Sequence, residues 1–186
     1  MQNLSRLPAN LPVPQDDGAA SHLTGLSLPH ILLPATSGAS VDLAARTGFF
    51  VVYFYPKTGR PDVPLPKDWD VIPGARGCTP QSCAFRDHMA ELKSLNAEVF
   101  GVSSQSTAYQ VEAKERLHLP FELLSDERFM FRDKLQLPIF SAEGEELYRR
   151  VTLIAHSGII KKVFYPVFPP DKNASEVINW LTENKK

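Results

Sequence analysis

The stretch that decides the fold is Phe49-Phe-Val-Val-Tyr-Phe-Tyr55, and Pro56 follows it directly. A run of β-branched and aromatic residues is typical of a strand that is buried on both faces of a sheet. A proline ends such a strand because it has no N–H to donate to a neighbour. We therefore predict a central strand over residues 49–55. The Pro- and Asp-rich segment at residues 57–77 predicts a loop of unusual length.

Beyond this loop, the apolar spacing alternates between the helical and the strand pattern. Thr79-Pro80 is typical of a helix start, and apolar residues recur at three- and four-residue spacing behind it. The other expected elements are strands at 97–103, 121–124, 150–155 and 159–165, with a hairpin turn at His156-Ser-Gly158, and helices at 79–95, 107–117, 173–184 and from the cap Ser125-Asp126 to Leu135. This order predicts an α/β fold with a mixed central β-sheet flanked by helices, the thioredoxin-like layout.

Residues 1–27 differ from the rest of the chain. They are rich in Pro, Ala, Ser and Asp and show little periodicity. Such a composition predicts an N-terminal arm that is packed on the surface or partly disordered. Residues 28–186 are expected to form one domain, because a single core is comfortable at about 100–200 residues.

Charge and hydropathy exclude several classes of function. The formal net charge is −1, from 20 basic and 21 acidic residues, so neither nucleic acid nor an anionic membrane is an expected partner. The longest apolar run, residues 49–55, is far shorter than the roughly 20 residues that span a bilayer. The first residues lack the apolar core of a secretory signal, which predicts a cytoplasmic location.

The chain has two cysteines, Cys78 and Cys83. Two thiols are too few for a closed zinc site, and the nearby His88 supplies no convincing further ligand set, so no metal is expected. Cys78 stands at the expected helix start, where unpaired N–H groups and the helix dipole favour a thiolate. Spacing alone leaves a second interpretation open, because free cysteines, Cys83 above all, are often plain core residues.

Helix geometry limits how the two cysteines can pair. Five residues of α-helix rise about 7.5 Å and turn about 140°, which puts the two Cα atoms roughly 8–9 Å apart. A disulfide needs less than about 7 Å. If both cysteines are helical when reduced, a disulfide between them requires local unfolding of about residues 76–86.

At this point the sequence resembles a known family. Five segments, in order and in register, are similar to signatures of the peroxiredoxins of the bacterioferritin comigratory protein (Q-type) subgroup, and the resemblance covers roughly residues 24–184. The most specific segment is Gly77-Cys-Thr-Pro-Gln-Ser-Cys-Ala-Phe-Arg-Asp87. The others are Tyr53-Phe-Tyr-Pro56, Ala97-Glu-Val-Phe-Gly-Val-Ser103, Leu123-Leu-Ser-Asp126 and Arg150-Val-Thr-Leu153.

The resemblance implies a role for three residues. Cys78 would be the peroxidatic cysteine, Cys83 the resolving cysteine, and Arg150 the residue that orients the thiolate and the peroxide. A guanidinium stays charged and donates several hydrogen bonds in a fixed fork. The neighbouring Arg149 points to the opposite face if the strand is regular, so only one of the two arginines can serve.

The chain departs from the family pattern just before Cys78. The family has a proline seven residues and a Thr or Ser three residues before the cysteine, where this chain has Val71 and Ala75. The hydroxyl that would bind the peroxide is therefore missing from its usual place. Pro56 is still expected to pack over the cysteine and shield it, and Thr58 or Thr79 is a candidate for the hydroxyl.

These expectations define a mechanism and its rivals. The substrate would be hydrogen peroxide or an organic hydroperoxide, a thioredoxin-type dithiol would recycle the enzyme, and a monomer is expected because both cysteines are on one chain. No metal, haem or flavin is required. One rival is a protein thiol–disulfide oxidoreductase, which normally carries Cys-x-x-Cys rather than the Cys-x-x-x-x-Cys found here. The other is a redox sensor in which Ala75 has removed most peroxidase activity.

Overall fold

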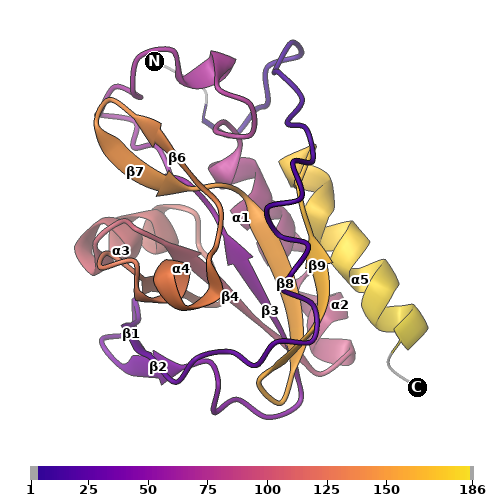
Figure 1. Ribbon diagram of the computed structural model, residues 1–186. Helices are drawn as coiled ribbons and strands as arrows, with labels where there is room; N and C mark the ends of the chain where they lie inside the picture. The colour runs from indigo at the N-terminus through magenta and orange to yellow at the C-terminus, as the bar shows by residue number, and fades with distance from the viewer. Residues whose placement is uncertain (1–3, 185–186) are drawn as a thin grey trace.

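The computed structural model describes residues 4–184, which fold around a five-stranded sheet (Figure 1). The strands are β1 Leu32–Pro34, β2 Ser40–Asp42, β3 Phe49–Phe54, β4 Ala97–Ser103, β5 Glu122–Ser125, β6 Ile139–Ala142, β7 Glu145–Tyr148, β8 Val151–His156 and β9 Ile159–Phe164. The α-helices are α1 Cys78–Asp87, α2 Met89–Ser94, α3 Thr107–Arg116, α4 Met130–Leu135 and α5 Asn173–Asn184, and two short 3-10 helices are η1 Trp69–Val71 and η2 Pro170–Lys172.

The central sheet confirms the predicted mixed layout. Its strand order is β5-β4-β3-β8-β9. β3 pairs in parallel with β4, and β4 with β5, whereas β8 is antiparallel to both β3 and β9. The run at residues 49–55 thus forms the middle strand, as its composition predicts.

β3 is buried on both faces and divides the core in two. One face packs against α4 and the segment before β1, and the other against α1, α2, α3 and α5. The side chains of β3 alternate between the apolar clusters on the two faces. Phe50, Val52 and Phe54 belong to the first cluster, and Val51 and Tyr53 to the second. Helices on both faces explain why this strand is apolar throughout rather than alternating.

Two of the predicted helices have different bounds in the structure. The helix expected over residues 79–95 is two helices, because the backbone leaves helical geometry at His88, with φ −94° and ψ 12°. The helix expected from Ser125-Asp126 begins only at Met130. Asp126 does cap it, since its carboxylate accepts from the backbone N–H of Met130 at 2.8 Å, but residues 126–129 form a turn.

The hairpin predicted at residues 156–158 is present. Ser157 and Gly158 have φ of 48° and 78°, the left-handed pair that a two-residue hairpin turn requires. Gly158 is further restricted, because a Cβ there would lie 2.7 Å from the carbonyl oxygen of Ala44. A second hairpin, β6–β7, is not among the sequence predictions, and neither is the small β1–β2 sheet.

The β6–β7 hairpin is the support of the long loop at residues 57–77. Trp69 of the loop is 3% exposed and packs with Ala75, Ala142 and Leu147 in a third apolar cluster. The Trp69 and Phe140 ring centroids are 6.0 Å apart. The loop is thus anchored on both sides of η1, and its last residues lead into α1.

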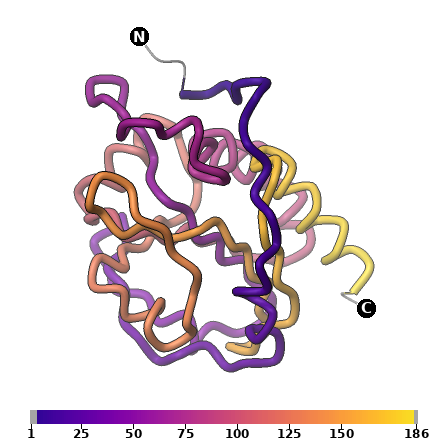
Figure 2. The backbone as a smooth tube through the Cα atoms, turned by 45° about the horizontal axis from the view of Figure 1, so that its top comes forward, coloured from indigo at the N-terminus to yellow at the C-terminus, as the bar shows by residue number. Residues whose placement is uncertain are grey.

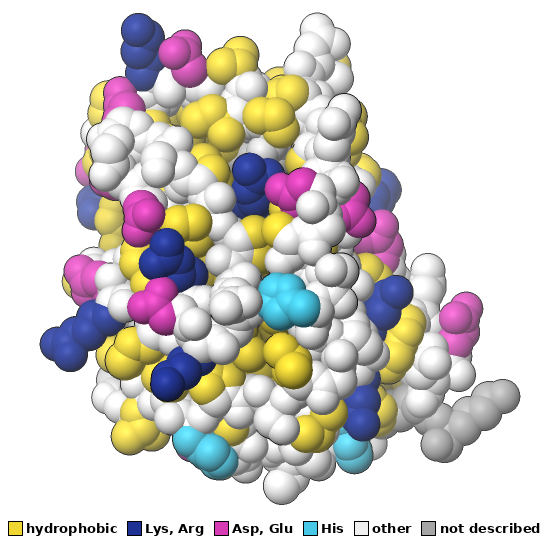
Figure 3. All heavy atoms as spheres, viewed as in Figure 1, with side chains coloured by type: hydrophobic (Ala, Val, Ile, Leu, Met, Phe, Trp, Pro, Cys, Tyr) yellow, Lys and Arg dark blue, Asp and Glu magenta, His cyan; other side chains and the backbone are white. Residues whose placement is uncertain are grey.

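The N-terminal segment descends along β8 and β9, as the indigo trace shows in Figures 1 and 2. Backbone hydrogen bonds at residues 25–28 join it to β9. Ala20 and Leu23 already belong to the core, ahead of the boundary predicted at residue 28. On this face, charges of both signs are interspersed, and hydrophobic side chains gather in the upper part (Figure 3).

Candidate active site

Cys78 is the first residue of α1, and the residue before it has to be glycine. Gly77 caps the helix with φ 111°, in the left-handed region. A Cβ on Gly77 would lie 2.3 Å from Pro170 Cγ and 3.0 Å from Leu7 Cδ2. The turn and the close packing both require glycine, and together they fix Cys78, which is 3% exposed, beneath η2 and the N-terminal segment.

Arg150 brings a positive charge to the Cys78 sulfur. It lies just before β8, is 3% exposed, and its Nη2 is 3.3 Å from Cys78 Sγ. The same nitrogen is 3.3 Å from each of the carbonyl oxygens of residues 74–76. A guanidinium and a helix N-terminus both stabilise negative charge on a nearby atom. The fold therefore surrounds Sγ with groups that suit a thiolate, and it is Arg150 rather than Arg149 that lies there.

A buried chain of polar side chains holds the Arg150 guanidinium. Nη1 donates to Gln81 Oε1 at 2.5 Å, and Gln81 Nε2 donates to Asn173 Oδ1 at 3.0 Å. The Thr152 hydroxyl donates to the same Asn173 oxygen at 2.7 Å. Sequence reasoning missed this series of hydrogen-bonded side chains. For Gln81 a signal existed, because it stands three residues after Cys78 and so shares a face of the helix with it.

One donor of Arg150 is left open. Its Nε is buried and has no hydrogen-bond acceptor among residues 4–184. An unsatisfied buried donor costs free energy, so this position favours an acceptor that comes from outside the protein. An oxygen atom of a small molecule beside Nε would satisfy it.

Aromatic side chains enclose the sulfur from the sheet side. Tyr53, Tyr55 and Phe85 pack in the same cluster as Cys78, with the Tyr53 and Phe85 rings stacked at 4.9 Å. Burial raises the pKa of both tyrosines well above the ordinary value, so both remain neutral phenols. Tyr53 Oη and Ser82 Oγ share a hydrogen bond of 3.0 Å, which ties the second turn of α1 to β3.

Cys83 lies in a different environment on the same helix. It is half-buried, and like Cys78 it is a free thiol. Burial raises the pKa of the Cys83 thiol, with the nearby Arg86 opposing this effect and Asp87 adding to it. Both cysteines are within α1, so helix geometry keeps their Cα atoms roughly 8–9 Å apart. They cannot form a disulfide in this conformation.

Of the remaining predicted residues, Pro56 lies beside the Cys78 cluster, whereas Thr58 makes its hydrogen bonds elsewhere. Pro56 is buried and directly follows Tyr55, a member of the Cys78 cluster. The Thr58 hydroxyl donates to Gln105 Oε1 at 3.0 Å, and its N–H donates to the same oxygen at 2.9 Å. No contact brings Thr58 to Cys78, so its role as a hydroxyl donor stays a prediction. Ala75 offers only its carbonyl oxygen, 3.8 Å from Sγ.

Within residues 4–184 no group of three or more His, Cys, Asp and Glu side chains is arranged to hold a metal ion. In the same part of the chain, no helix combines the length and the apolar character that a membrane span requires.

The sequence is similar to known proteins over most of its length. Residues 23–178 match the model of the family described as Redoxin. Peroxiredoxin Q, chloroplastic, from Sedum lineare is 32% identical over 165 residues, which cover 87% of this chain and 78% of that protein. Peroxiredoxin Q, chloroplastic, from Oryza sativa subsp. japonica is 32% identical over 158 residues, or 84% of this chain. The matched region spans 65% of the rice protein, a little less than two thirds of its length.

Solved structures agree on the fold. Peroxidoxin BcpB from Mycobacterium tuberculosis superimposes with a TM-score of 0.72 at 22% identity, over 88% of this chain and 98% of that one. The bacterioferritin comigratory protein of Xanthomonas campestris gives a TM-score of 0.68 at 20% identity, over 96% of this chain and 100% of that one. The predicted thioredoxin-like fold is confirmed. Family model and sequence relatives lead to one conclusion: this chain belongs to the redoxin family and, within it, to the Q-type peroxiredoxins.

Proposed function

We propose that this protein is a thiol peroxidase in which Cys78 reduces hydroperoxides and Cys83 resolves the oxidised product. The observation that carries the proposal is the 3.3 Å contact between Arg150 Nη2 and Cys78 Sγ at the start of α1. Family membership supports it, and so does the alkyl peroxide reduction activity of the Xanthomonas campestris protein.

The first step is attack by the Cys78 thiolate on the peroxide. Sulfur attacks one peroxide oxygen in line with the O–O bond, so that an S–O bond forms as the O–O bond breaks. The other oxygen leaves and takes a proton from solvent to become water or an alcohol. Cys78 is oxidised to a sulfenic acid. Arg150 stabilises the thiolate through Nη2, and its open Nε donates to the peroxide oxygen as charge develops there.

The second step joins the two cysteines. The Cys83 thiolate attacks the sulfenic sulfur, an S–S bond forms as the S–O bond breaks, and the departing hydroxide takes a proton from solvent to become water. Because helix geometry separates the cysteines, the first two turns of α1 have to unwind. The hydrogen bonds from Gln81 to Asn173 and between Ser82 and Tyr53 have to break with them. Both contacts therefore oppose the opening of the helix.

An external dithiol completes the cycle. A reductant of the thioredoxin type would attack the Cys78–Cys83 disulfide by thiol–disulfide exchange and return both thiols. The two cysteines lie on one chain, so the cycle needs no second subunit, and we propose that the protein acts as a monomer.

The test is a single-turnover reaction with hydrogen peroxide. Free thiols and intact mass are followed in the reduced wild type, in Cys78→Ser and in Cys83→Ser. We expect the wild type to lose both thiols quickly, Cys83→Ser to accumulate a sulfenic acid, and Cys78→Ser to react only at the slow rate of an ordinary thiol.

A redox sensor is the second candidate, favoured by one observation. Ala75 is fully buried and presents no hydroxyl at the position where the family carries one. If the three proteins are oxidised equally slowly in the single-turnover reaction, the sensor replaces the peroxidase.

A further inference from the structure

Residues 4–17 are the outer part of the N-terminal segment, and from here on the word arm means these residues alone. They precede the region that matches the family model and lie against the loop before Cys78. Leu7 packs over Gly77, where a Cβ would be 3.0 Å from Leu7 Cδ2. Pro14 packs over Gly74, where a Cβ would be 3.7 Å from the proline ring. The arm therefore covers the backbone that positions Cys78.

A polar latch holds the far end of the arm. The Tyr165 hydroxyl donates to Asp17 Oδ1 at 2.8 Å, and Arg149 Nη1 lies 3.5 Å from Asp17 Oδ2. The Tyr165 hydrogen bond lowers the pKa of Asp17, and burial together with this bond raises the pKa of Tyr165 to about 12. Asp17 and Arg149 are both half-exposed, and exposed ion pairs stabilise weakly. The latch holds the arm but opens easily.

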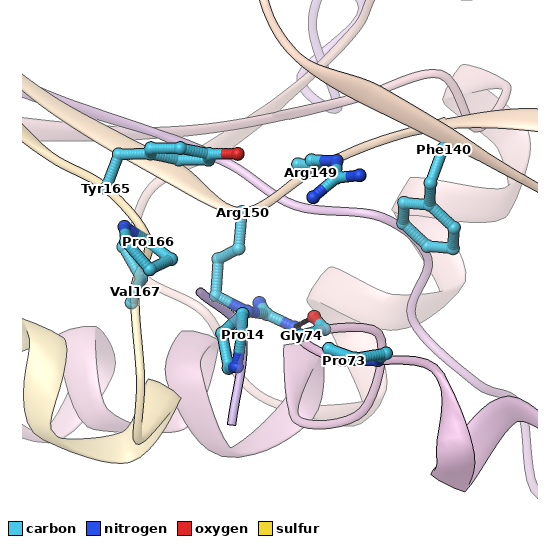
Figure 4. A pocket seen from close by; sticks show the side chains of 9 residues that line it. All are labelled: Pro14, Pro73, Gly74, Phe140, Arg149, Arg150, Tyr165, Pro166 and Val167. Carbon is cyan, nitrogen blue, oxygen red and sulfur yellow. Dashed lines mark hydrogen bonds between the residues drawn. The ribbon is translucent and has the colours of Figure 1, made fainter. Parts of the chain in front are cut away.

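Between the arm and the sheet lies a small cavity that ends on Arg150. Figure 4 shows Pro14 and Gly74 beside the end of the Arg150 side chain, with Tyr165, Pro166 and Val167 on one side. The cavity has about 20 Å³ of room for the centres of water-sized molecules. A single water needs about 10–15 Å³ by this measure. With the arm in place, the cavity beside Arg150 has room for little more than one water-sized molecule.

The arm is a weakly held wall of this cavity. Cys78 is 3% exposed, so a peroxide reaches Sγ only when part of the surroundings moves. The loop wall at Gly74 is held more firmly, because the carbonyl oxygens of residues 74–76 each lie 3.3 Å from Arg150 Nη2. The arm is held by the exposed latch and by half-buried apolar contacts.

We propose that the arm is a specificity element that walls the peroxide entrance at Arg150 and, while latched through Asp17, selects hydrogen peroxide over bulky organic hydroperoxides. This inference rests on the peroxidase function proposed above. A small peroxide enters with a slight shift of Pro14. A hydroperoxide with a large organic group needs the whole arm displaced, and so its reaction depends on how often the latch opens.

The experiment compares two peroxides on the full-length protein. Rate constants for Cys78 oxidation by hydrogen peroxide and by cumene hydroperoxide are measured in single-turnover reactions, and their ratio is taken. The double variant Pro14→Gly/Asp17→Ala removes the ring and the latch. We expect the ratio of cumene hydroperoxide to hydrogen peroxide rates to rise about tenfold, the low end of the roughly 10–200-fold by which a pocket discriminates over a single methylene.

Asp16→Ala is the matched control. Asp16 carries the same charge one residue away, and its carboxylate accepts from the backbone N–H of Gly18. Its ratio should equal that of the wild type. An unchanged ratio in the double variant, with hydrogen peroxide still reduced quickly, would overturn the arm proposal alone. Failure of both peroxides to oxidise the wild type at Cys78 would overturn the peroxidase function as well.

Discussion

The first and second turns of α1 hold two identical thiols in opposite surroundings. In the first turn, Cys78 is almost fully buried, lies at the helix N-terminus and contacts the Arg150 guanidinium. In the second turn, Cys83 is half-buried, and burial raises its pKa. Its neighbour Arg86 is shared, since the guanidinium also donates to Asp87 and to the carbonyl of Leu117.

This difference supports the order of events that we propose for the two cysteines. The Cys78 thiol contacts the Arg150 guanidinium, and in the proposed cycle it attacks while the helix is folded. A thiol that burial keeps protonated is not ready to attack, and it gains reactivity only when the second turn opens. In the proposed cycle the folded helix thus suppresses disulfide formation until its first two turns unwind. Each prediction below changes one side of this contrast and leaves the other in place.

The largest effect is expected at Arg150. In Arg150→Met the side chain keeps its bulk but loses the charge and the donors at Sγ. We expect the rate of Cys78 oxidation by hydrogen peroxide to fall about 100–1000-fold, the usual cost of removing a donor that stabilises developing charge. Peroxide consumption in a stopped-flow instrument measures this rate.

Arg46→Met is the control for this change. Arg46 pairs with Glu98 on the surface, and both side chains are partly exposed. Its rate should stay within about twofold of the wild type, because surface ion pairs contribute little. If Arg150→Met reacts as fast as the wild type, the first turn owes its reactivity to the helix terminus alone.

A smaller effect is expected at Asn173, which acts on Cys78 through Gln81 and Arg150. Asn173→Ala leaves the amide of Gln81 and the hydroxyl of Thr152 without their acceptor. We expect a loss of about 1–3 kcal/mol in unfolding free energy and about a tenfold slower attack by Cys78, since misplacing a catalytic group is costly. Chemical denaturation and single-turnover kinetics measure the two losses.

If Asn173 positions Arg150, its substitution changes the rate of Cys78 oxidation as well as stability, whereas a purely structural role changes stability alone. Asn173→Asp keeps an oxygen acceptor and should restore most of the rate. Asn184→Ala, an exposed change at the other end of α5, should alter neither quantity. A destabilised Asn173→Ala protein with normal kinetics would show that the polar chain supports the fold and not the arginine.

The order of strands and helices could be predicted because each element carries its own local signal. β4 and α5 have the predicted bounds, since an unbroken apolar run and a regular helical spacing mark them. The β6–β7 hairpin escaped because its strands are short and its turn, Glu143-Gly144, is a weaker hairpin signal than Asn-Gly. The break between α1 and α2 at His88 could not be predicted, because no Pro or Gly marks it in the sequence.

The candidate site divides in the same way. Cys78, Cys83 and Arg150 were predicted from a contiguous motif and a family resemblance. Gln81 and Asn173 are 92 residues apart, and only the packing of α1 against α5 brings their amides together. The arm has no counterpart in the family model and no periodicity, so its position over Gly74 and Gly77 could come only from the structure.

The smallest effect concerns pH and the second turn. Burial raises the pKa of Cys83 in folded α1, so the folded helix favours the protonated thiol; this preference is fully present below the ordinary thiol pKa and is lost as pH rises towards the raised value. In the unwound segment the pKa returns to about 8.5. We therefore expect disulfide formation, followed by rapid quench and mass analysis, to accelerate about fivefold between about pH 7.5 and 8.5 and to level off above.

The matched measurement is sulfenic acid formation in Cys83→Ser over the same pH range, which reports attack by Cys78 alone. If Cys83 reacts from an unwound segment, only the disulfide step levels off near the ordinary thiol pKa. A disulfide rate that keeps rising well above pH 9 would mean that the thiolate forms while Cys83 is still buried. In that case the second turn would not have to open before Cys83 ionises, and the contrast between the two turns would lie in geometry rather than in protonation.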